Sequence, residues 1–184
     1  MKTTKKHLQE VPYFSSTFHA YLNENPALRP FYNRLPSVEA ASDQMSEKKF
    51  PEEKRQLLTE VLTDQYQGIT TSPAVEKNID LLNQPNSFTV VTGHQLNLFT
   101  GPLYVILKMI TTINACEELK KAYPDKEFIP VYWMASEDHD FDEINHFNFN
   151  GEQYTWNTDQ TGAVGRFSLK DMGPLLEKLS AFPP

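Results

Sequence analysis

The 184-residue chain lacks several features that would assign it to a specialised class of protein. It has one cysteine, Cys116, so no disulfide can form within the chain and no four-cysteine zinc site exists. No early apolar run resembles a signal peptide, and no stretch has the length of a membrane span. The G-x-G-x-x-G and Walker lysine fingerprints of nucleotide sites are also absent. We therefore expect a cytoplasmic protein with no membrane partner, and we interpret Cys116 as a buried structural thiol.

Basic side chains are also fewer than acidic ones. The chain has 17 Lys and Arg against 24 Asp and Glu, which gives a formal net charge of -7. No cluster of basic residues is interleaved with aromatic residues, as a nucleic-acid interface would require. The sequence therefore predicts no nucleic-acid partner. With 39% hydrophobic residues, the chain is able to bury a sizeable core.

The first part of the chain has the spacing of helices separated by proline and glycine. Apolar residues recur at helical intervals, and serine or proline stands where several helices would start. The expected helices cover residues 13–22, 38–48 and 51–68, with a further one that starts at Ser72–Pro73. We predict that residues 1–86 form a helical arm that packs on the core.

Residues 87–184 have the pattern of a β-α-β unit followed by short strands. Strands are expected at 88–91 and 128–134, and the helical pattern of 103–123 lies between them. Such a crossover is right-handed and makes the two strands parallel. Pro130 is awkward in a central strand, so we place it near the strand's start. A β-rich insertion is expected after about residue 146, with strands at 147–149, 153–156 and 166–169 and a last helix from Leu175.

A polar loop directly follows the first strand. In an open parallel sheet, ligands bind beyond the carboxyl ends of the strands. Thr100-Gly101-Pro102 opens the long helix, whose amino end favours phosphate or carboxylate. Histidine at His94 can act as an acid, a base or a donor to a developing negative oxygen; the alternative is a capped turn in which His94 bonds to backbone. The candidate binding residues here are Thr92, Gly93, Gln95, Asn97, Thr100 and Gly101, with His94 as a catalytic candidate.

A second polar loop, residues 136–143, follows the second strand. It holds five carboxylates in eight residues, and His139 lies among them. A solvated acidic turn is one interpretation, and a ligand set for Mg²⁺, Mn²⁺ or Zn²⁺ is another, although no H-E-x-x-H spacing is present. We take His139 and Asp140 as catalytic candidates and Trp133 and Glu137 as binding candidates; no residue is assigned to a metal. His146 is better explained as a structural histidine.

The two loops also carry a specific resemblance. The strings TGHQLNLFTGPLY at 92–104 and PVYWMASEDHDFDEINH at 130–146 closely resemble the bacillithiol-biosynthesis cysteine-adding enzymes, also called cysteine ligases. The segments LRPFYN at 28–33 and GAVGR at 162–166 resemble the same family. The resemblance covers nearly the whole chain, and its two central motifs are long and unusual.

The resemblance implies a Rossmann-like, nucleotidylyltransferase-like parallel sheet and a role in low-molecular-weight thiol synthesis. The implied reaction joins the carboxyl group of cysteine to the free amine of glucosaminyl malate. Because amide formation from a free acid is uphill in water, a ligase normally activates the carboxylate with ATP, so ATP/ADP is a candidate cofactor. A divalent metal at the acidic loop is a second candidate. His94 would stabilise charge on the transferred group, while His139 and Asp140 would position or deprotonate the attacking amine.

Members of the family are longer, and their remaining part includes a coiled-coil region used to form a homodimer. The resemblance therefore implies that this chain is an incomplete amino-terminal portion that does not catalyse the reaction alone. Two other functions stay open from the residues. One is a metal-dependent hydrolase or phosphotransferase that uses the acidic loop, and the other is a non-catalytic assembly module.

Overall fold

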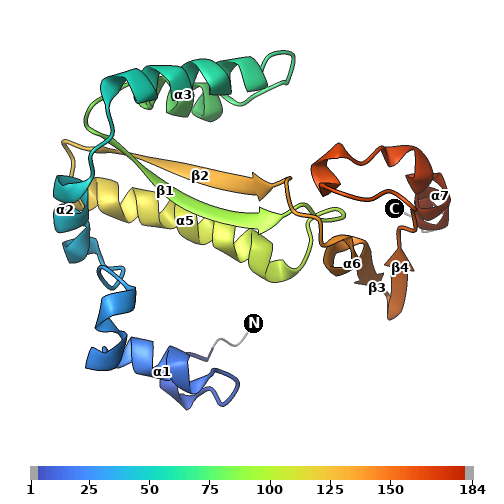
Figure 1. The fold of residues 1–184 in the computed structure, drawn as a ribbon, viewed down its shortest axis with the longest axis horizontal. Coiled ribbons are helices and arrows are strands. Elements are labelled where there is room, and N and C mark those ends of the chain that lie inside the picture. Colours follow the sequence, from blue (N-terminus) through green and yellow to red (C-terminus); the bar gives the residue numbers. More distant parts are fainter. Residues whose placement is uncertain (1–3, 181–184) are drawn as a thin grey trace. The chain divides into compact units, whose positions relative to one another are not determined.

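The two α-helices of the amino-terminal unit each begin after a serine whose side chain accepts a hydrogen bond from an early backbone N–H group. The computed structural model describes residues 4–180, which divide into two compact units, 4–48 and 49–180. The Oγ atoms of Ser15 and Ser37 accept hydrogen bonds from Phe18 N at 3.2 Å and Ala40 N at 3.1 Å. The first unit consists of η1 (Leu8–Glu10), α1 (Ser16–Leu22), η2 (Pro26–Phe31) and α2 (Val38–Glu47), where η marks a 3-10 helix (Figure 1).

An ion pair ties the connector after η2 to the end of α2. The Arg34 guanidinium contacts both carboxylate oxygens of Glu47, with Nη1 at 2.8 Å from Oε2. This hydrogen bonding, helped by Asn33, lowers the pKa of Glu47 to about 2 from its ordinary value of 4.5. Within this unit, the pair fixes how the chain enters and leaves α2.

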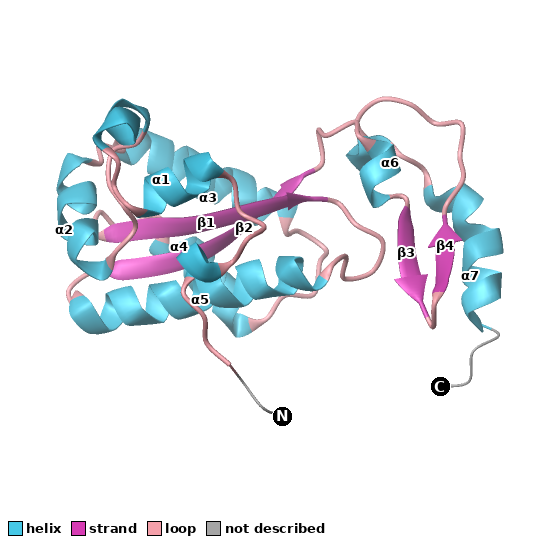
Figure 2. Ribbon diagram, turned by 90° about the horizontal axis from the view of Figure 1, so that it is seen from below, coloured by secondary structure: helices cyan, strands magenta, loops and turns pink. Residues whose placement is uncertain are grey.

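The second unit is built on two parallel strands, β1 (Ser87–Gln95) and β2 (Glu127–Ala135). They pair in register from Ser87 with Glu127 to Gln95 with Ala135. Helix α5 (Leu103–Ala122) connects them and packs on both strands. Helix α4 (Pro73–Leu81) contacts β2, and α3 (Glu52–Gln65) packs on α4. Figures 1 and 2 show α5 on one face of the strand pair and α3 with α4 on the other. The predicted β-α-β unit with parallel strands is confirmed.

Arg55 fastens α3 to the start of β1. Its guanidinium donates to Ser87 Oγ at 2.9 Å, to Leu82 O at 3.1 Å and to Ser87 O at 3.2 Å. Ser87 is 2% exposed, so these bonds lie inside the unit. As a result, α3 and α4 belong to the same unit as the strands, and the predicted arm 1–86 is divided between the two units. The domain boundary at residue 86 stays a prediction.

A small lobe follows β2 within the second unit. Its elements are α6 (Phe141–Ile144), β3 (His146–Phe149), β4 (Glu152–Thr155), η3 (Val164–Arg166), η4 (Leu169–Met172) and α7 (Gly173–Ser180). Strands β3 and β4 form an antiparallel hairpin. Tyr154, Trp156 and Leu175 are buried together, and Phe141 and Phe167 pack against them. The lobe therefore has its own aromatic core.

Three expectations about strands are corrected by the structure. β1 continues through Gln95, so the first part of the predicted loop is strand. Pro130 pairs with Val90 in the middle of β2; among the described residues β2 is flanked by β1 alone, and its other edge tolerates a residue without an N–H. Residues 166–169 do not form a strand, because Arg166 ends η3, Leu169 begins η4, and the backbone of Ser168 between them bonds to the Gln160 side chain.

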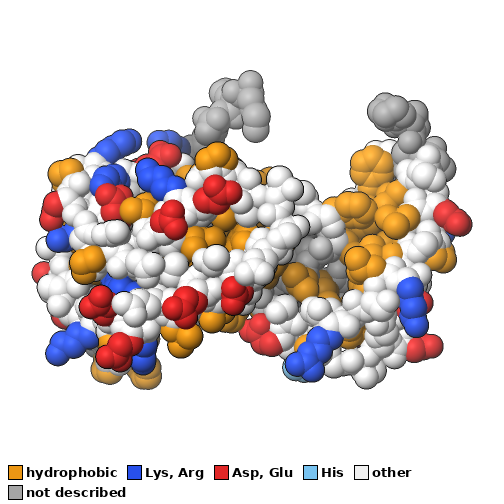
Figure 3. All heavy atoms as spheres, turned by 90° about the horizontal axis from the view of Figure 1, so that it is seen from above, with side chains coloured by type: hydrophobic (Ala, Val, Ile, Leu, Met, Phe, Trp, Pro, Cys, Tyr) orange, Lys and Arg blue, Asp and Glu red, His pale blue; other side chains and the backbone are white. Residues whose placement is uncertain are grey.

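Large apolar side chains remain at the surface of the second unit (Figure 3). On α5, Leu103, Leu107 and Ile110 lie on one side of the helix and are 47–69% exposed. At the sheet, Val91, Trp133 and Met134 are 58–59% exposed. Apolar surface of this extent commonly marks a place where another protein segment packs. Within residues 4–180, none of the helices combines the length and apolar character needed to span a membrane.

Candidate functional site

His94 lies at the carboxyl end of β1, where the sheet presents its polar residues. Its register partner is Met134, and the neighbouring Gly93 pairs with Trp133. A Cβ atom at Gly93 would stand 3.1 Å from Trp133 O, so the missing side chain allows close approach of the two strands. His94 itself is half-buried. The strand thus holds the histidine on a rigid support at the edge where ligands bind in open parallel sheets.

Asn97 fixes the orientation and the tautomer of the His94 ring. Its Nδ2 donates to Gln95 O at 2.9 Å and lies 3.0 Å from His94 Nδ1. Because Nδ2 carries two hydrogens, it can serve both acceptors. Gln95 O is also 3.2 Å from Nδ1, but a proton on Nδ1 would set it donor-to-donor against Asn97. We therefore assign the ring proton to Nε2.

Tyr104 and Lys108 reach the same end of β1 from the first two turns of α5. Tyr104 Oη lies 2.7 Å from His94 Nε2, and the two rings are tilted at 5.2 Å between centroids. Lys108 Nζ donates to the carbonyl of Gly93. Residues four apart on a helix lie on the same side, so the hydroxyl and the ammonium face the strand end together. These two groups add a donor and a positive charge to the site.

Gly101 makes room for Asn97. Its φ is +63°, a left-handed conformation in which other residues are strained. A Cβ atom there would lie 2.8 Å from Asn97 Cγ and 2.9 Å from Asn97 Cβ. Gly101 therefore affects His94 indirectly, because it leaves room for Asn97, the side chain that orients His94.

The second loop is closed by its own backbone and by the start of η3. Ser136 O accepts from Gly165 N at 2.9 Å, and Asp138 O accepts from Val164 N at 2.8 Å. Asp138 Oδ1 accepts from Asp140 N at 2.8 Å, which shapes the turn before α6. His139 and Asp140 are both exposed on this turn. The loop is a defined structure that displays these two side chains to solvent.

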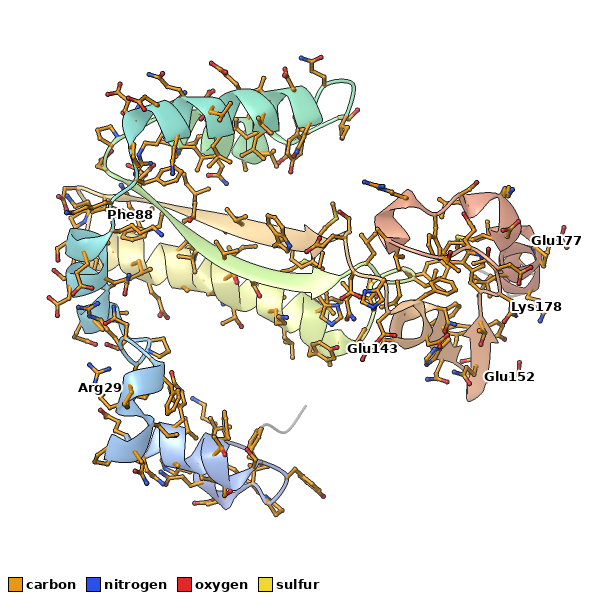
Figure 4. All side chains as sticks on the ribbon, viewed as in Figure 1. Arg29, Phe88, Glu143, Glu152, Glu177 and Lys178 are labelled. Atoms are coloured by element: carbon orange, nitrogen blue, oxygen red, sulfur yellow. The ribbon has the colours of Figure 1, made fainter. Side chains whose placement is uncertain are left out.

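Gln95 joins the two loops. Its Nε2 donates to Glu143 Oε2 at 2.7 Å, and Figure 4 shows Glu143 beside the end of β1. Further along the first loop, Phe99 contacts Phe147 with ring centroids 5.0 Å apart, and Leu98 packs on the aromatic core of the lobe. The first loop is thereby anchored to the segment that follows the second loop.

The structure gathers some of the predicted site residues and leaves others apart. Gly93, His94, Gln95, Asn97 and Gly101 form one connected group. Within residues 4–180, no hydrogen bond or ion pair links the side chains of His139 and Asp140 to that group. The other candidates lie nearby in the chain: Thr92 within β1, Trp133 within β2, and Thr100 and Glu137 exposed on the two loops. Their functional roles stay predictions.

Sequence reasoning did not assign roles to Tyr104, Lys108 or Glu143. Tyr104 and Glu143 stand inside the two motifs, but neither motif reveals which side chains meet after folding. The i to i+4 spacing of Tyr104 and Lys108 at the start of a helix that follows a polar loop was the available signal. It places both on one side of the helix without saying that this side faces His94.

The geometry gives little support to a metal site or to a reactive cysteine. Among residues 4–180, no three His, Cys, Asp or Glu side chains gather as a metal-holding group. Cys116 is 6% exposed in the interior of α5, and burial raises the pKa of its thiol to about 11. The thiol is therefore protonated and enclosed, in agreement with a structural role.

Comparison with known proteins identifies the family. The model of "Bacillithiol biosynthesis BshC, N-terminal Rossmann-like domain" matches residues 1–182. The chain is 49% identical over 167 residues to the "Putative cysteine ligase BshC" of Flavobacterium psychrophilum, covering 89% of this chain and 32% of that protein. It is 47% identical over 171 residues to the protein of the same name from Flavobacterium johnsoniae, covering 92% and 32%.

A third relative, the "Putative cysteine ligase BshC" of Christiangramia forsetii, is 47% identical over 178 residues, covering 94% of this chain and 33% of that protein. The chain thus spans about a third of the length of the curated relatives it matches. The family match also confirms the Rossmann-like fold class predicted from the two loop motifs. The chain belongs to the BshC family of bacillithiol biosynthesis and corresponds to its amino-terminal Rossmann-like domain.

Proposed function

We propose that the protein carrying this domain is a ligase that joins the carboxyl group of cysteine to the free amine of glucosaminyl malate. The names of its relatives support a cysteine ligase of bacillithiol biosynthesis. The observation that carries the proposal is the His94 network at the end of β1. There, Asn97 and Tyr104 hold one imidazole in one tautomer at the ligand-binding edge of a parallel sheet.

The reaction needs an activated carboxyl group. ATP would convert the cysteine carboxylate to an acyl phosphate, releasing ADP, or to an acyl adenylate, releasing pyrophosphate. The amine nitrogen then attacks the carbonyl carbon and loses a proton, and phosphate or AMP leaves with the former carboxylate oxygen. Both routes develop negative charge on oxygen atoms, so N–H and O–H donors fixed near the reacting carbon lower the barrier.

The two loops supply groups suited to these steps. On the first loop, the Nε2–H end of His94 points to Tyr104, and the ammonium of Lys108 lies close by on the Gly93 carbonyl. These groups would place positive charge near the anionic oxygens of the activated cysteine. On the second loop, His139 and Asp140 are displayed to solvent and would orient the amine and take its proton. The Gln95–Glu143 bond connects the two loops.

The part of the family's proteins that lies beyond this domain would complete the site. The exposed apolar residues of α5, including Leu103 and Leu107, and of the strand ends, including Trp133, form a surface on which that part can pack. We propose that it supplies further walls of the nucleotide pocket and the contacts of a homodimer. We also propose that the protein acts in the cytoplasm, where a biosynthetic ligase would meet its small-molecule substrates.

Product formation measured by mass spectrometry tests the proposal. The full-length protein is incubated with cysteine, glucosaminyl malate and ATP, and each component is omitted in turn. We expect the mass of the amide product when all three are present, with ADP or AMP in equal amount, and none from the 184-residue chain alone. Amide formation without nucleotide consumption would contradict the activation chemistry, and absence of product would contradict the ligase assignment.

A histidine variant tests the role of the second loop. His139→Ala is expected to slow product formation by about 100-fold, the usual contribution of a general base. His146→Ala is the matched control, because His146 lies in β3 and its Nδ1 is 2.9 Å from Asn145 Oδ1. A rate for His139→Ala as high as that of the control variant would remove His139 from the mechanism.

A further inference from the structure

We infer that Tyr104 binds the substrate directly, donating its hydroxyl hydrogen to a carboxylate or phosphate oxygen. The inference rests on the proposed function for the identity of the anion. The starting observation is the proton arrangement around His94. Asn97 Nδ2 occupies the lone pair of Nδ1 at 3.0 Å, and the same amide is fixed by its bond to Gln95 O. The ring therefore carries its proton on Nε2.

This tautomer decides which way the tyrosine hydroxyl points. The Nε2–H group donates to Tyr104 Oη across 2.7 Å, so the oxygen is the acceptor of that bond. The hydroxyl hydrogen is then directed elsewhere. Within residues 4–180, no acceptor for it is present. A phenol that accepts one hydrogen bond becomes a better donor in the next, because the bonds in a chain polarise one another.

The position of Tyr104 makes this donor available to a ligand. Its side chain is 51% exposed in the first turn of α5, next to the carboxyl end of β1. Lys108, one turn further along the same helix side, brings a positive charge to Gly93 O. A donor beside a cation favours an anionic oxygen over a neutral one. In the proposed reaction that oxygen belongs either to cysteine or to the nucleotide phosphates.

The test combines Tyr104→Phe with ligands that lack the anionic group. Binding of cysteine, cysteamine, ADP and adenosine to the full-length protein is measured by calorimetry. Cysteamine lacks the carboxylate of cysteine, and adenosine lacks the phosphates of ADP. Tyr66→Phe is the control, since Tyr66 is 39% exposed at the end of α3 and belongs to neither loop. The NMR signals of the His94 ring report whether the tautomer is kept.

We expect Tyr104→Phe to weaken one of the anionic ligands by about 10- to 100-fold, the effect of losing a hydrogen bond to a charged group. Its anion-free analogue should bind as before. A selective loss for cysteine assigns the contact to the carboxylate, and one for ADP assigns it to phosphate. Tyr66→Phe should change neither.

Equal effects on a ligand and its analogue, or no effect at all, would overturn the inference and leave Tyr104 as a support for His94. If neither cysteine nor ADP binds the unaltered protein, the proposed function itself fails. If both bind and the variant makes no difference, only the role of Tyr104 fails. The two failures are therefore distinguishable.

Discussion

Replacing Gly101 with alanine should disturb the His94 network without touching the histidine. Gly101 has a φ of +63°, and a non-glycine residue in this region costs about 1–2 kcal/mol. The new Cβ would also lie 2.8 Å from Asn97 Cγ, which forces that side chain to move. Asn97 makes two hydrogen bonds, each worth about 0.5–1.5 kcal/mol. We therefore expect a total loss of about 2–5 kcal/mol in unfolding free energy.

Gly68→Ala separates backbone strain from the collision. Gly68 has a similar φ of +76°, and a Cβ there meets nothing within 4 Å. Urea unfolding should show a loss of about 1–2 kcal/mol for Gly68→Ala. The further loss in Gly101→Ala should come with a changed NMR tautomer signal of His94. Equal losses in the two variants, with an unchanged His94 signal, would refute the link from Gly101 through Asn97 to the histidine.

Three further predictions follow from contacts elsewhere in the chain. Glu143→Ala releases the Gln95 side chain and should lower kcat/KM by up to about tenfold. Because the bond is exposed, the unfolding free energy should change by less than about 0.5 kcal/mol. A large loss of stability would instead show that the bond is structural. Cys116, whose pKa is raised to about 11 by burial, should resist iodoacetamide at pH 8 and react fully in urea; rapid labelling of the folded protein would contradict its enclosure. Arg34 lowers the pKa of Glu47 to about 2, so the stabilising effect of the Glu47 carboxylate is present above pH 4.5 and lost as the pH falls towards 2. Thermal unfolding followed by circular dichroism should therefore show a weaker dependence of stability on pH in this range for Glu47→Gln.

The local sequence pattern was sufficient to predict the long helix and the parallel β-α-β unit. The helical spacing of apolar residues in 103–123 and the β-branched run before it predicted the crossover that the structure contains. Strand β1 was underestimated because its second half, Thr92 to Gln95, is polar and includes a glycine. It remains a strand because each of its residues has a partner in β2, and such pairing is invisible in a single segment.

Tertiary contacts explain what could not be predicted. Residues 166–169 have strand-like composition, but no strand among the described residues lies beside them, and Gly165 instead approaches Ser136. At the site, the motif contained His94 and Asn97, and their bond spans only three residues. The Tyr104 contact spans ten residues and the Glu143 contact spans 48, so both depend on how α5 and α6 are placed. The sequence therefore predicted a candidate site but not the contacts between its residues.

The rate of amide formation by a His94→Gln variant of the full-length protein tests the central claim most directly. Glutamine keeps a polar side chain but cannot reproduce the ring that links Asn97 to Tyr104. His7→Gln is the matched control, because His7 is exposed in the amino-terminal unit. We predict a loss of about 100-fold or more for His94→Gln and an unchanged rate for His7→Gln. Full product formation by a folded His94→Gln protein would contradict the placement of the reaction at this strand end.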